Sequence, residues 1–150
     1  PEDIKKIADN FSISVQQAVD EYTEHIMLEI IENTGSYLYM PYLTLKKNKD
    51  GCIFAKDNLC EIHKFKPYQC KNTPFVSEFF SDKNWKIYLQ KNCPGLNDMK
   101  EKDFTQYVEI GQASEETEKN YYYLLRKNSF SLEKILEINL KAPKIVTEND

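Results

Sequence analysis

The chain has 150 residues, of which 41% are hydrophobic and 29% are charged, and its net charge is −4. A chain of this length fits one domain and buries about two thirds of its unfolded surface, so it does not depend on disulfides to fold. No apolar run approaches the roughly 20 residues of a membrane span, and no basic, apolar leader follows Pro1. We therefore expect one cytoplasmic domain over residues 1–150 with no membrane partner.

The charge is unevenly distributed along the chain. Residues 1–45 carry two lysines and eight acids, whereas residues 46–91 carry ten lysines and five acids. Three of the four cysteines lie in this basic segment, where lysines would offset the negative charge of a metal–thiolate centre. A solvated lysine-rich loop region is the plain alternative. We do not expect nucleic-acid binding, because the chain is acidic and lacks the known recognition motifs.

Two helices are predicted in the N-terminal third. Ile4, Ile7, Ala8 and Phe11 recur with helical spacing after Pro1. Ser14 and Gln17 form a capping-box pattern that opens a second helix. The apolar stripe of that helix is predicted to consist of Val15, Ala18, Val19, Tyr22 and Ile26. His25 would then be a surface residue of this helix.

The middle of the chain has the features of a small β region. Asp50-Gly51 separates β-prone runs and predicts a hairpin, and Asp57-Asn58 predicts a second turn. Pro67 suits a turn or the first turn of a short helix. Alternation of Trp85, Ile87 and Leu89 predicts one more strand, and Cys93-Pro94-Gly95 a tight turn.

The C-terminal third is predicted to be helical. Tyr121 to Lys127 continues one helix, with its tyrosines as a packing seam. Ser131 can cap a last helix that carries Leu132, Ile135, Leu136 and Leu140 and stops at Pro143. The expected fold class is α+β, mostly helical, with helices flanking a small irregular cysteine-bearing β region.

The four cysteines follow the spacing Cys52-x7-Cys60-x9-Cys70-x22-Cys93. Each lies at a predicted turn or shortly after a proline, and loops that wrap an ion are typical of structural metal sites. We therefore interpret Cys52, Cys60, Cys70 and Cys93 as candidate metal ligands. Disulfides in an oxidising compartment and free packing thiols are alternatives. The lack of a C-x2-C pair excludes a zinc ribbon, a thioredoxin motif and a bacterial ferredoxin run.

Short motifs surround these cysteines in a fixed order. They are Cys52-Ile53-Phe54, Cys60-Glu61-Ile62-His63, Lys66-Pro67-Tyr68-Gln69-Cys70-Lys71, Thr73-Pro74-Phe75 and Cys93-Pro94-Gly95. This order resembles the YkgJ-type cysteine-cluster family, and the similarity extends over about residues 1–97. Residues 98–150 would then form a C-terminal helical extension. The resemblance implies a zinc- or iron-chelating domain, with zinc, iron or an iron–sulfur cluster as cofactor.

The chain also departs from the family pattern. His63 stands where the family has Tyr, and Lys66 and Lys71 replace arginines, which keeps the positive charge but loses the planar guanidinium. The family's C-x2-C-x2-C-C cluster is missing, so we expect it either to precede Pro1 in a longer chain or to be lacking in this member. His63 is a further possible zinc ligand, although it can equally be a solvent-facing replacement of the tyrosine.

Catalysis is left open by the sequence. The family's domain also occurs in lysine N-methylases that act on flagellin, so a methylase-like enzyme is one alternative. An interaction domain with a purely structural metal is another. No G-x-S-x-G or H-E-x-x-H motif occurs, and the four glycines are too scattered for a phosphate-binding loop. Metal binding is therefore the expected function, without an identified substrate or protein partner.

Overall fold

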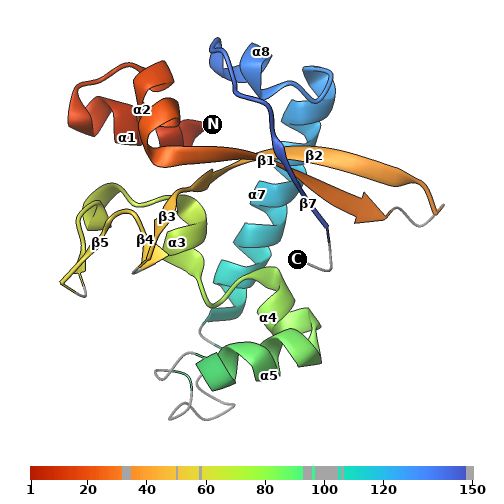
Figure 1. Cartoon of the computed structure of the whole chain (residues 1–150). Helices are drawn as coiled ribbons and strands as arrows, with labels where there is room; N and C mark the ends of the chain where they lie inside the picture. Colours follow the sequence, from red (N-terminus) through yellow and green to blue (C-terminus); the bar gives the residue numbers. More distant parts are fainter. Residues whose placement is uncertain are drawn as a thin grey trace. The chain divides into compact units, whose positions relative to one another are not determined.

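The structure is a computed structural model that describes residues 1–31, 35–49, 51–57, 59–92, 96, 105 and 107–147. The fold is α+β and mostly helical, with small separate sheets, as the sequence predicts. The chain divides into two compact units. The first unit comprises Pro1–Lys66 and Leu125–Asp150, and the second comprises Pro67–Leu124. Figure 1 shows the elements of both units.

The first unit begins with two amphipathic helices, α1 (Glu2–Phe11) and α2 (Val15–Tyr22). The capping box at the start of α2 is confirmed, because the Ser14 hydroxyl accepts from the Gln17 backbone N–H while the Gln17 side chain accepts from the Ser14 N–H. The apolar faces of these helices meet later segments in one core. Its buried members are Ile4, Ile7, Ala8, Ala18, Val19, Phe54, Ile62 and Leu136.

A three-stranded sheet follows α2, with the strand order β2-β1-β7. Strand β1 (Thr23–Ile31) pairs antiparallel with β2 (Tyr37–Leu45) and parallel with β7 (Lys144–Val146). The prediction that the second helix extends to Ile26 is wrong, since α2 ends at Tyr22 and the chain becomes extended at Thr23. Helical spacing of Tyr22 and Ile26 favours a helix locally, but pairing with β2 satisfies the backbone of this segment instead.

The C-terminal segment is fixed to α2 and β1 by side chain to backbone hydrogen bonds. Ser131 caps α8 (Leu132–Leu136) as predicted, but this helix ends before Leu140, because Glu137 adopts a left-handed conformation. The Gln16 side-chain amide both donates to the carbonyl and accepts from the N–H of Asn139, at 2.9 and 2.8 Å. These bonds hold the segment that leads to β7, a strand that was not predicted from the sequence.

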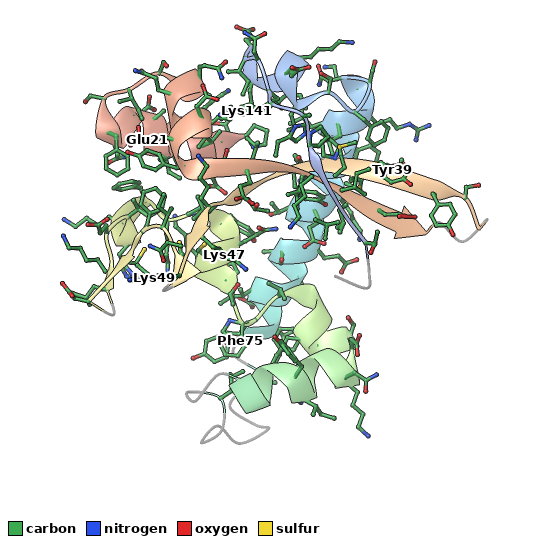
Figure 2. All side chains as sticks on the ribbon, in the orientation of Figure 1. Glu21, Tyr39, Lys47, Lys49, Phe75 and Lys141 are labelled. Carbon is green, nitrogen blue, oxygen red and sulfur yellow. The ribbon has the colours of Figure 1, made fainter. Side chains whose placement is uncertain are left out.

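His25 lies in β1, so its placement on a helix is wrong. Its Nδ1 lies 3.0 Å from the Lys141 carbonyl oxygen, and since a carbonyl can only accept, Nδ1 carries the proton. Nε2 is buried and has no hydrogen-bond partner within the described residues. The imidazole thus serves as another attachment point for the C-terminal segment (Lys141 is labelled in Figure 2).

The second unit is helical in its described residues. It contains α3 (Tyr68–Asn72), α4 (Ser77–Ser81), α5 (Lys83–Asn92) and most of α7 (Val108–Lys127). The strand predicted around Trp85 is wrong, since this segment is α5. The Asp82 carboxylate accepts from the Asn84 N–H at 2.8 Å and caps the start of the helix.

Aromatic rings pack the second unit. Phe75 stacks on Tyr107 with ring centroids 3.8 Å apart and meets Phe79 edge-on at 5.4 Å. Gly111 of α7 allows close approach to α4, because a Cβ at this position would lie 2.6 Å from the Phe80 ring. Across the described helices of both units, none has the length and apolar character needed to cross a bilayer.

Candidate metal centre

Two consecutive short hairpins carry Cys52 and Cys60. In the first, β3 (Lys47–Asn48) pairs antiparallel with β4 (Gly51–Cys52), and in the second, β5 (Ala55–Lys56) pairs antiparallel with β6 (Leu59–Cys60). Each hairpin is closed by an equivalent backbone bond of 3.0 Å, from Ile53 to Lys46 and from Glu61 to Phe54. Hairpins thus lie where the two turns were predicted, but the run Tyr42 to Leu45, expected as an arm of the first hairpin, belongs to β2 and pairs with β1 instead (β3, β4 and β5 in Figure 1).

The two cysteines occupy the same place in their hairpins. Cys52 is the cross-strand partner of Lys47, and Cys60 is the partner of Ala55. Two positions after each cysteine lies a core residue, Phe54 at 3% and Ile62 at 1% exposure. The x7 spacing therefore corresponds to one hairpin repeat. No internal repeat was predicted from the sequence, although Cys, an apolar residue two positions later and an Asp-containing turn recur in it.

Local backbone conformation sets the direction of both turns. Gly51 has φ +116°, a value that residues with a Cβ rarely adopt. In the second hairpin, Asp57 has φ 51°, in the left-handed region that Asp and Asn tolerate better than other residues. Gly51 and Asp57 are therefore local causes of the hairpins that present the two thiols.

The surroundings of the two thiols differ. Cys52 is half-buried and packs against the core of the first unit, whereas Cys60 is exposed beside Leu59, which is 74% exposed. Neither Cys52 nor Cys60 forms a disulfide. Cys60 is thus open to an approaching ion, while Cys52 also contributes to packing.

An aromatic cluster anchors the hairpins to the helices. Phe54, which joins the two hairpins, lies 4.9 Å from the Tyr22 ring and 6.0 Å from the Phe11 ring, measured between centroids. Phe11 also meets Phe65 edge-on at 5.8 Å. The position of the thiols therefore depends on α1 and α2 and not on a metal alone.

Lys46 makes a second connection between the hairpins and α2. Its backbone N–H donates to the Tyr22 carbonyl at 2.9 Å, and its Nζ donates to the Asp20 and Glu21 carbonyls at 2.6 and 3.0 Å. These carbonyls belong to the last turn of α2, and the last carbonyls of a helix have no backbone donor within it. A cation here is also favoured by the helix dipole.

Burial of the Tyr22 ring raises the pKa of its hydroxyl above the ordinary value, and a hydrogen bond to Glu21 and the charges of Glu21 and Glu61 raise it further. The neutral phenol is therefore the form that suits this position beside Phe54.

Lysines accompany the cysteines in both hairpins. Lys47, Lys49 and Lys56 are exposed, and Figure 2 labels the first two. His63, the possible additional ligand, begins a 3-10 turn (His63–Phe65) and is exposed. The positive charge that the sequence places near the thiols is thus present on the hairpins themselves.

Of the other two candidate ligands, the structure describes only Cys70. Cys70 is an exposed residue of α3 in the second unit, and Pro67 occupies the N-cap position directly before that short helix. Cys93 and the predicted Pro94-Gly95 turn lie outside the described residues. Where the structure is described, no three or more His, Cys, Asp or Glu side chains form a group that could hold a metal ion.

Comparison with known proteins identifies no relative, because no family model, no curated protein and no solved structure matches the chain.

Proposed function

We propose that the chain is a cytoplasmic metal-binding protein that holds zinc, iron or an iron–sulfur cluster through cysteine thiolates. The observation that carries this proposal is the equivalent placement of Cys52 and Cys60 on two successive hairpins, each as the second residue of the strand that follows the turn. A repeated cysteine-bearing hairpin can supply two ligands, because the backbone pairing fixes the cysteines while leaving their thiols accessible.

The chemistry of the donors fits such a metal. Cys52 and Cys60 are free thiols, and Cys60 is exposed. Two thiolates are fewer than the four ligands of a structural zinc site or of a typical cluster. Cys70 and Cys93 are proposed as the remaining ligands on the sequence pattern, together with any cysteines that the resemblance expects upstream of Pro1.

Lysines on the hairpins support the same proposal. A four-thiolate zinc or iron–sulfur centre carries net negative charge, which Lys47, Lys49 and Lys56 would offset. Thiolates bind zinc and iron–sulfur clusters alike, so the donor set fits both metals. A reducing compartment keeps such thiols available, which is the reason for proposing the cytoplasm.

The proposal is tested by metal stoichiometry in matched variants. We expect Cys60→Ser to lower the zinc or iron content of the purified protein several-fold, since it removes an exposed ligand without a packing role. Leu59→Ser, which alters the neighbouring exposed position, should leave the content unchanged. Equal metal content in wild type and both variants, measured by elemental analysis, would remove Cys60 from the site and contradict the proposal.

A further inference from the structure

Strand β2 is an outer strand of its sheet, and no strand in the described residues pairs with its far edge. Its sequence, Tyr37–Leu45, contains no charged residue. At the beginning of the strand, Tyr37 is 62% and Tyr39 is 43% exposed (Tyr39 is labelled in Figure 2). Natural sheets usually protect such edges with charge or irregularity, so an uncharged, exposed edge points to a partner.

The backbone polarity of this edge follows from the register. Lys46 donates its N–H to the Tyr22 carbonyl, on the side of β1, and in an antiparallel ladder such bonding alternates along the strand. Even-numbered residues of β2 therefore direct their backbone N–H and C=O groups toward β1. Odd-numbered residues direct these groups toward the free edge of the sheet. Pro41 agrees with this assignment, since it lacks an N–H and sits where no donor to β1 is needed.

Tyr37 and Tyr39 consequently direct their backbone groups away from β1. Neither residue has a further hydrogen bond in the part of the chain that the structure describes. The two residues thus form a short segment with donors and acceptors ready to pair with another strand, and this segment ends at Pro41, which can donate nothing.

We propose that a second copy of the chain pairs with this edge, antiparallel and with its two-fold axis through Leu38. Tyr37 then lies opposite Tyr39 of the partner subunit, and each such pair exchanges both of its N–H···O bonds. The same register brings Tyr37 and Tyr39 of the partner subunit together on one face of the extended sheet, where cross-strand aromatic pairs are favourable.

A second copy fits this edge because the segment is complementary to itself. A tyrosine stands on each side of Leu38, so the sequence reads the same in both directions across the proposed two-fold axis. The strand also carries no charge that would repel an identical strand. Four partly exposed tyrosines bury less than the roughly 1,000 Å² that a stable interface needs. The dimer is therefore weak and depends on concentration.

Sedimentation velocity of the full chain tests the proposal. Between about 10 µM and about 1 mM the wild type is expected to shift from monomer to dimer. Replacing both residues, in the variant Tyr37→Lys/Tyr39→Lys, places like charges opposite each other and should weaken association at least about tenfold. Tyr123→Lys, at an exposed tyrosine of α7, is the control and should dimerise like the wild type.

Amide hydrogen exchange of the wild type provides a second readout that does not depend on how the variant folds. Raising the concentration should slow exchange at the Tyr37 and Tyr39 amides, while Leu38 and Met40, which already face β1, should change little. A chain that stays monomeric over the whole range would overturn the proposal. A dimer in which the Tyr37 and Tyr39 amides exchange as fast as in the monomer would overturn it as well.

Discussion

Cys52 and Cys60 have equivalent backbone positions but different environments, and this predicts different effects on stability. In metal-free protein, Cys52→Ser should lower the free energy of unfolding by about 1 kcal/mol, because it introduces a hydroxyl against a partly apolar core. Cys60→Ser should change it by less than about 0.5 kcal/mol, as is usual for an exposed position. Urea unfolding with a chelator present measures both values, and equal losses would refute the packing role of Cys52.

Tyr22 predicts a pH dependence at the alkaline end. Its pKa is raised from 10.0, so the folded state holds the phenolic proton more tightly than the unfolded chain. The stabilising contribution is therefore complete below pH 10.0 and is lost as the pH rises through the raised pKa. Between about pH 9 and about pH 11, wild type should lose more stability than Tyr22→Phe.

The control for this experiment is Tyr123→Phe, at an exposed tyrosine. Urea midpoints at the two pH values should fall as steeply in this variant as in the wild type. If Tyr22→Phe also falls that steeply, the Tyr22 phenol does not contribute to the alkaline loss of stability.

At the scale of elements, the end of α2 and the first hairpin are joined through one lysine. Lys46→Met keeps the aliphatic chain but removes the donors to Asp20 and Glu21, and should cost about 1 kcal/mol of stability. Lys47→Met, at the exposed neighbouring residue, should be nearly neutral. Urea unfolding measures both free energies. If Lys46→Met leaves the free energy of unfolding unchanged, the hydrogen bonds from Lys46 to the end of α2 do not stabilise the fold.

Elements with local signals were predicted from the sequence, whereas elements that depend on distant partners were not. The capping box at Ser14 and the Asp-Gly turn act within a few residues, so they were readable. Strand β1 was missed because Tyr22 and Ile26 also suit a helix, and its pairing with β2 and β7 involves residues far along the chain. Strand β7 contains too few residues for any periodic pattern.

The segment around Trp85 was misassigned for a different reason. Alternation over a few residues fits both a strand and a helix, and the deciding feature is the cap at Asp82, which a search for N-cap residues would have found. Of the candidate site, the turns beside Cys52 and Cys60 were predicted, but their unequal burial was not. That inequality arises from packing against α1 and α2, which no spacing rule contains.

At the scale of the whole molecule, the proposed function rests on metal binding by the cysteines. The most direct test is metal analysis together with the absorption spectrum of the protein purified without exposure to oxygen. We expect stoichiometric zinc in a colourless protein, or iron with absorption near about 400 nm that dithionite bleaches. A metal-free protein with Cys52 and Cys60 joined in a disulfide would contradict the account.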